Sequence, residues 1–127
     1  MSGVTPEAGL APTADAAQVK ITRDDLLGAW QGFNHGPLKI DLVALGSPHF
    51  SLEETRLFAR LMSGARGHGD TAVIVTLGRD VLAVARDQGL VDALEETGVR
   101  LMADLCWCSI TEPVYPPNAQ TLMTNSG

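Results

Sequence analysis

The stretch that decides the fold is DLVALGSPHFS, residues 41–51. Residues 40–45 are apolar apart from one aspartate, and such a continuous run is typical of a strand covered on both faces of a parallel sheet. The Gly-Ser-Pro that follows predicts a turn. Ser51 and Glu54 then have the spacing of a capping box, which marks the start of a helix. The stretch therefore predicts a strand, a loop and a helix in succession.

Outward from this stretch, the chain keeps alternating between helix and strand patterns. Further strands are predicted over 71–77, 99–103 and 121–124, and helices over 23–31, from Ser51 onward, over 79–88 and over 90–97. Because such alternation is typical of right-handed crossover units, we predict an α/β fold: a small three-layer parallel sheet flanked by helices. Residues 1–19 are expected to be a flexible lead-in, and 20–127 a single α/β domain.

Composition excludes some classes of function. With 127 residues, 45% of them hydrophobic, the chain can form one domain with a core. Net charge is −6, with no basic stripe, which argues against nucleic-acid binding, and no apolar run is long enough to cross a membrane. Charged residues make up only 19%, so part of the surface is expected to lie against another domain or subunit. Absence of a signal-peptide pattern and two cysteines in a non-secreted chain predict a cytoplasmic location.

Polar side chains gather where the first strand ends. Ser47, His49 and Ser51 lie between that strand and the following helix, the position where ligands bind in parallel α/β sheets. Hydroxyls, an imidazole and the N–H groups of a helix N-terminus would suit a carboxylate. Each residue also has an ordinary structural interpretation, since Gly-Ser-Pro makes a turn and Ser51 caps a helix. Both interpretations stay open at this point.

Two later strand ends carry further candidates. Arg79 follows a strand and begins a helix, where the helix dipole mildly disfavours a cation, so we interpret it as a carboxylate-binding residue. Its alternative is a plain surface arginine. Asn125 and Ser126 follow the last predicted strand and are either site residues or a simple turn.

Cys106 is the candidate metal ligand. It lies just beyond the third predicted strand, beside Trp107, and Cys108 follows two positions later. A buried apolar cysteine is the alternative interpretation. Two cysteines cannot complete a four-ligand metal site, so any further ligands would have to come from elsewhere.

Taken together, these motifs resemble a known family. GSPHFSLEE (46–54), D-x-C-W (104–107) and MTNSG (123–127), with GVTPEA (3–8) near the start, are similar in order and spacing to the large, catalytic subunit or domain of aconitase X. That subunit is several times longer, so we expect this chain to be a piece of a longer catalytic subunit.

The resemblance implies a hydro-lyase, that is, a dehydratase acting on a small hydroxy-carboxylate such as cis-3-hydroxy-L-proline or on mevalonate 5-phosphate. It implies an iron–sulfur cluster or iron held by cysteines, with Cys106 as one ligand. It also implies that the rest of the large subunit and a small swivelling subunit or domain complete the site, so the isolated chain is expected to be inactive. Ser47, His49, Ser51, Arg79, Asn125 and Ser126 are the expected substrate-binding residues.

Two other classes of function remain open from the sequence. One is a free-standing Rossmann-like or flavodoxin-like module that binds a small carboxylate without catalysis. The other is a structural or interaction domain of a larger assembly.

Overall fold

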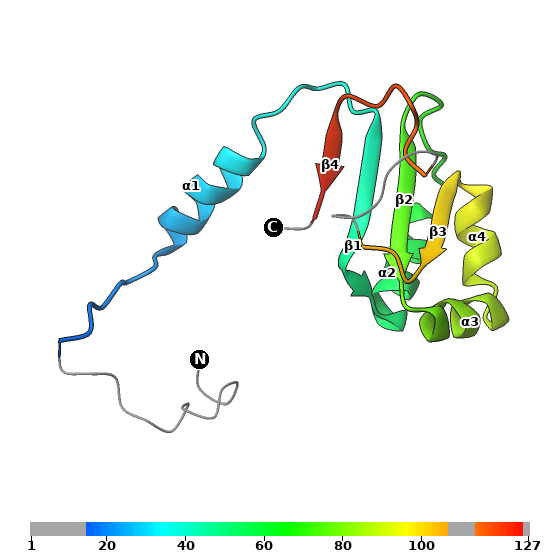
Figure 1. The fold of residues 1–127 in the computed structure, drawn as a ribbon, viewed down its shortest axis with the longest axis horizontal. Helices are drawn as coiled ribbons and strands as arrows, with labels where there is room; N and C mark the ends of the chain where they lie inside the picture. Colours follow the sequence, from blue (N-terminus) through cyan, green and yellow to red (C-terminus); the bar gives the residue numbers. More distant parts are fainter. Residues whose placement is uncertain (1–14, 107–113, 126–127) are drawn as a thin grey trace. The chain divides into compact units, whose positions relative to one another are not determined.

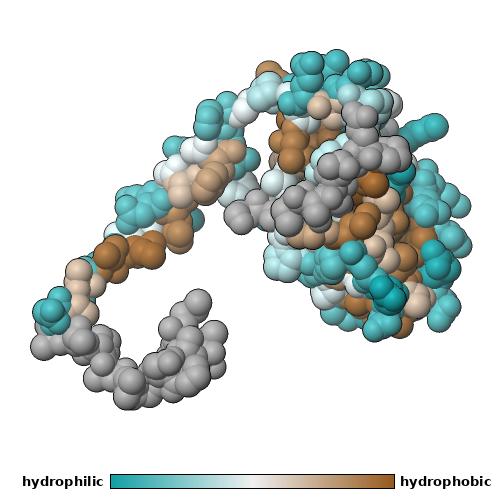
Figure 2. All heavy atoms as spheres, in the orientation of Figure 1, coloured by the Kyte–Doolittle hydropathy of each residue, from teal (hydrophilic) through white to brown (hydrophobic). Residues whose placement is uncertain are grey.

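The computed structural model describes residues 15–106 and 114–125, and it divides into two compact units, Met1–Gly36 and Pro37–Gly127. The described part of the first unit contains helix α1 (Arg23–Phe33). Thr22 begins this helix with a capping box, because its hydroxyl and backbone N–H exchange hydrogen bonds with Asp25. No residue of α1 is buried, and Figure 2 shows hydrophobic side chains exposed along it.

The second unit contains a sheet of four parallel strands, which confirms the predicted α/β class. Its order is β3-β2-β1-β4 (Figure 1). The strands are β1 (Leu42–Phe50), β2 (Ala72–Leu77), β3 (Val99–Ala103) and β4 (Leu122–Thr124), and the helices are α2 (Leu52–Met62), α3 (Arg79–Asp87) and α4 (Leu90–Glu96). Among the described residues, no helix is long and apolar enough to cross a bilayer.

The two faces of the sheet are covered differently. On one face, α2, α3 and α4 pack over a core that includes Phe50, Val75 and Leu77. On the other face, Leu42, Ala44, Ile74 and their neighbours pack against residues 114–119, which contain no helix. Right-handed crossovers explain this difference, because β1, β2 and β3 step in one direction and the return to β4 must cross the opposite face. In the described chain, the layer on this second face is therefore an irregular segment and not the predicted helices.

The expected loop after the first strand is instead the irregular end of β1, so this boundary was predicted wrongly. Leu45 pairs with Val75, and pairing resumes between Phe50 and Leu77. Four residues, 46–49, therefore bulge opposite the single residue Thr76. Pairing resumes because Phe50 is buried and packs edge-to-face on Phe58, with ring centroids 6.0 Å apart.

Asp41 anchors the opposite end of β1 to the start of β4. Its carboxylate accepts hydrogen bonds from the backbone N–H groups of Gln120 and Thr121, each at 3.0 Å, and from the Thr121 hydroxyl at 2.8 Å. These bonds favour the ionised form and lower the pKa of Asp41 below its ordinary value. The aspartate that interrupts an apolar run is therefore explained by strand pairing.

Candidate functional site at the carboxyl edge of the sheet

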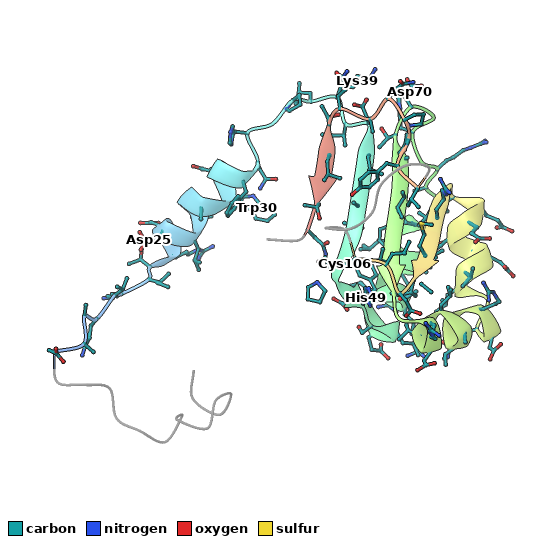
Figure 3. All side chains as sticks on the ribbon, in the orientation of Figure 1. Asp25, Trp30, Lys39, His49, Asp70 and Cys106 are labelled. Carbon is teal, nitrogen blue, oxygen red and sulfur yellow. The ribbon has the colours of Figure 1, made fainter. Side chains whose placement is uncertain are left out.

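The candidate residues gather at one edge because all four strands are parallel and their carboxyl ends meet there. Figure 3 shows His49 and Cys106 at this edge, and Lys39 and Asp70 at the amino edge. The sequence-based expectation that separate strand ends would contribute to one place is thus met for the described residues. All of them belong to the second unit.

The bulge at the end of β1 presents Ser47 and His49. Ser47 is half-buried, and His49 is exposed. His49 Nε2 lies 2.8 Å from the backbone oxygen of Leu105, in the segment after β3. Because a carbonyl oxygen can only accept, Nε2 carries the proton, and in the neutral ring Nδ1 is left as an acceptor. The imidazole therefore connects the end of β1 to the segment after β3, and its Nδ1 can accept a further hydrogen bond.

Arg79 begins α3 one residue after β2 ends, and its hydrogen bonds go to the carboxylate of Asp104 in the same chain. Its backbone N–H donates to Asp104 Oδ1 at 3.0 Å, and its Nε donates to Oδ2. These two bonds, aided by the charges of Arg79 and His49, lower the pKa of Asp104 against a smaller opposing effect of burial. The Arg79 side chain remains 79% exposed.

Asp104 is the residue that sequence reasoning missed. It follows β3 with φ of 56°, the left-handed region that aspartate tolerates better than most residues, and its N–H donates to the oxygen of Leu77 at 3.0 Å. The sequence contained one indication of such a residue. Gly78, at the start of α3, has no side chain with which to cap the helix, so an acceptor from elsewhere in the chain is needed. An acid from another strand supplies the missing acceptor.

Cys106 lies two residues beyond Asp104 and is exposed, so its thiol is not part of the apolar core of this domain. Among the residues that the structure describes, no group of three or more histidines, cysteines or acids could hold a metal ion. The chemistry of an exposed thiol fits one ligand of a centre whose other ligands lie elsewhere. Trp107, Cys108 and Ser126 lie outside the described residues.

Ser51 caps α2, as its position predicted. Its hydroxyl donates to Glu54 Oε2 at 2.7 Å and accepts from the Glu54 N–H at 3.2 Å. Hydrogen bonds from the Ser51 N–H and hydroxyl lower the pKa of Glu54. The Ser51 hydroxyl is thus already engaged within the helix terminus.

Asn125 is exposed and directly follows β4. The last residue pair of this strand, Thr124 with Ala44, lies two residues before the bulge of β1 begins at Gly46. Asn125 therefore emerges on the Ser47 side of the carboxyl edge.

Two surface hollows among the described residues of the second unit lie away from these candidates. One is lined by Glu95 and residues 98–102, along β3. Another lies at the amino edge, where Asp41, Asp70 and Asn118 contribute to its wall. The candidate residues therefore occupy an open edge, where other parts of a larger protein would have to form the remaining walls.

This parallel sheet carries an imidazole, a guanidinium and a thiol at its carboxyl edge, which is the edge where parallel α/β domains in general bind ligands. A sequence model of the aconitase X third domain matches residues 40–127. The chain belongs to the aconitase X family. This finding confirms the resemblance inferred from the three motifs.

Three relatives illustrate the likeness. The cis-3-hydroxy-L-proline dehydratase of Pseudomonas aeruginosa is 42% identical over 98% of this chain, which covers 22% of that protein. The phosphomevalonate dehydratase large subunit of Aeropyrum pernix is 31% identical over 84% of this chain and is covered to 26%. The crystal structure of Thermococcus kodakaraensis aconitase X in its holo-form superposes with a TM-score of 0.73 at 27% identity, over 98% of this chain and 31% of that one. This chain thus spans roughly a quarter of the curated relatives' length.

Proposed function

We propose that this chain forms one domain of an iron-dependent hydro-lyase that dehydrates a small hydroxy-carboxylate such as cis-3-hydroxy-L-proline. The observation that carries this proposal is the 42% identity with a cis-3-hydroxy-L-proline dehydratase across nearly the whole chain. The arrangement of His49, Arg79 and Cys106 along one sheet edge supports it. Because the chain covers 22% of that relative, it would show little activity alone.

Cys106 would hold iron, either in an iron–sulfur cluster or as a single centre, together with ligands from outside this chain. When bound, the iron supplies a Lewis acid that draws electrons from the leaving hydroxyl. Because Cys106 is exposed, its thiol is accessible to a metal whose other ligands come from another part of the protein. A thiolate is the form that binds such a metal.

The substrate carboxylate would meet the guanidinium of Arg79. The bonds to Asp104 use Nε and the backbone N–H, so the terminal amino groups remain to form a bidentate pair with a ligand. His49 Nδ1 would accept a hydrogen bond from a substrate hydroxyl or amine. Ser51 would act through the α2 N-terminus that it caps, and Ser47, Asn125 and Ser126 would line the same pocket.

The partners implied by this proposal are the rest of the large subunit and a small subunit or domain that closes over the edge. Three archaeal relatives are named as large subunits, which supports a two-part enzyme. The catalytic base would come from that second part. We also propose a cytoplasmic location.

Replacing Cys106 with serine in the full-length protein tests the iron assignment. Cys106→Ser should lower the iron content per polypeptide and reduce dehydration of cis-3-hydroxy-L-proline by roughly a hundredfold or more, since a metal ligand is lost. Cys108→Ser is the matched control and should leave both nearly unchanged. Wild-type iron content and turnover in Cys106→Ser would show that this cysteine is not a ligand.

A carboxylate-binding module without catalysis is the second candidate, favoured by the open edge with its exposed arginine. A thermal-shift screen of the 127-residue chain separates the two candidates. Stabilisation by proline-like carboxylates, together with a full-length protein that neither binds iron nor dehydrates hydroxyproline, would favour the module.

A further inference from the structure

We propose that Asp104 is a positioning residue, which fixes Arg79 and the Cys106 segment relative to one another at the carboxyl edge. The inference rests on the proposed function for its consequence in catalysis. Its geometry, however, is formed entirely by residues of this chain.

Asp104 makes three hydrogen bonds to the turn between β2 and α3. The N–H of Asp104 donates to the oxygen of Leu77, and its carboxylate accepts from both the backbone and the side chain of Arg79. Leu77 ends β2, and Arg79 begins α3. Asp104 therefore ties the end of β3 to the junction between β2 and α3.

The bonds between Asp104 and Arg79 include both an exposed ion pair and a helix cap. Ion pairs between exposed side chains contribute little to stability, and both partners here are exposed. The same carboxylate, however, supplies the helix-capping acceptor that Gly78 lacks, and the dipole of α3 favours a negative charge at that place. These bonds orient the Arg79 side chain more than they stabilise the fold, because the Asp104 carboxylate holds Nε of the guanidinium group.

Asp104 also directs the residues that follow it in the chain. The left-handed backbone of Asp104 turns the segment after β3, so that the Leu105 oxygen meets His49 Nε2 at 2.8 Å. Cys106 comes next. Its backbone thus follows directly on two anchored residues, Asp104 on the β2–α3 junction and Leu105 on the bulge of β1. Through Asp104 and Leu105, the three strand ends that carry His49, Arg79 and Cys106 are connected.

The test uses the full-length protein with its metal. Asp104→Asn keeps a residue that tolerates the left-handed backbone but removes the charge and one acceptor. It should raise the KM for hydroxyproline by roughly tenfold and change the visible absorption spectrum of the iron centre, as losses of outer hydrogen bonds do. Combining it with Arg79→Gln should be little worse than Arg79→Gln alone, because the two residues act as one unit.

Asp80→Asn is the matched control, since it removes the same charge from an exposed position one residue after Arg79. It should leave the KM and the spectrum unchanged. A wild-type KM and spectrum in Asp104→Asn would overturn the proposal. If Asp104→Asn does not fold, Asp104→Glu keeps the charge but moves the carboxylate, and it should still raise the KM and change the spectrum.

A second readout needs neither iron nor turnover. In metal-free protein carrying Cys108→Ser, the rate of Cys106 alkylation by iodoacetamide reports how this segment is held. Asp104→Asn should change that rate several-fold relative to Asp80→Asn, and equal rates would overturn the positioning role. A wild-type protein without iron or dehydratase activity would instead overturn the proposed function, while the alkylation result would still decide the role of Asp104.

Discussion

Gly46 is the residue on which the bulge of β1 depends. Its φ is +102°, and a Cβ built on it would lie 2.1 Å from the backbone oxygen of Thr76. The buried Thr76 hydroxyl donates to the Gly46 oxygen at 2.7 Å, which holds the two strands in close approach. Only glycine satisfies both the backbone conformation and the spacing.

Gly46→Ala should therefore destabilise the chain. We expect a loss of more than about 1 kcal/mol in the free energy of unfolding, because an alanine at positive φ is strained and its methyl group displaces Thr76. Urea unfolding with an unchanged m-value measures the loss. Gly69→Ala is the control, since a Cβ added there would meet no atom of the described chain within 4 Å. Similar midpoints for the two variants would contradict this account.

At the residue scale, the sequence predicts what depends on near neighbours. Ser51 caps α2 by exchanging hydrogen bonds with Glu54, which lies three residues later. The local sequence pattern is therefore sufficient to recognise this cap. Asp104 caps a helix that begins 25 residues earlier, and His49 bonds to a residue 56 positions away. Such contacts depend on strand order, which no local pattern contains. The cluster could therefore be predicted, but not the residue that connects it.

Among the elements, β4 depends most on a single side chain. Its short strand is exposed throughout, so little apolar burial holds it to β1. The carboxylate of Asp41 instead holds Gln120 and Thr121 in place by hydrogen bonds. An ionised carboxylate accepts such bonds more strongly than a neutral acid.

This attachment should weaken in acid. The folded pKa of Asp41 is lowered from its ordinary 3.8, so its contribution to stability is present above that pH and is lost as the pH falls through the lower folded value. Asp41→Asn should therefore lose stability relative to wild type at neutral pH, and this difference should shrink below about pH 3.8. Thermal unfolding against pH measures it. Asp70→Asn, at the same sheet edge, should show a smaller and flatter difference; an equal one would contradict the assignment.

The sequence predicted most elements to within two residues, because caps, apolar periodicity and glycine breaks are local. The Val99–Ala103 strand is correct at both ends, and the 90–97 helix ends one residue earlier than predicted. The end of β1 is the exception. A Gly-Ser-Pro turn signal was present, but the burial of Phe50 against Phe58 brings the chain back into pairing with β2, in a shifted register. Tertiary packing overrode the local signal there.

At the scale of the whole molecule, much apolar surface remains exposed. On α1, Leu26, Leu27, Trp30 and Phe33 recur at helical spacing on one side, and Phe33 is 86% exposed. In the other unit, Leu61 on α2 and both apolar residues of β4 are exposed. Monomeric proteins rarely leave such patches uncovered, which agrees with a domain that belongs in a larger polypeptide.

The isolated chain should therefore self-associate. Sedimentation velocity over a range of concentrations should show a rising mean sedimentation coefficient, because water is excluded from the apolar side of α1 in the complex. Replacing Trp30 and Phe33 with serine should reduce this association. Gly28→Ser, on the opposite side of the helix, serves as the control. A single slow species at every concentration would contradict the expectation.

The pairing of β1 with β4 has a consequence for synthesis on the ribosome. Asp41 and Thr121 are 80 residues apart, whereas β1, β2 and β3 follow one another closely along the chain. The first three strands can therefore assemble while the fourth is still inside the exit tunnel. Until β4 emerges, the Asp41 carboxylate lacks its partners Gln120 and Thr121, and the edge of β1 that pairs with β4 has no neighbouring strand. Translation thus completes the Asn125 end of the carboxyl edge last, after the Asp104 connection has formed.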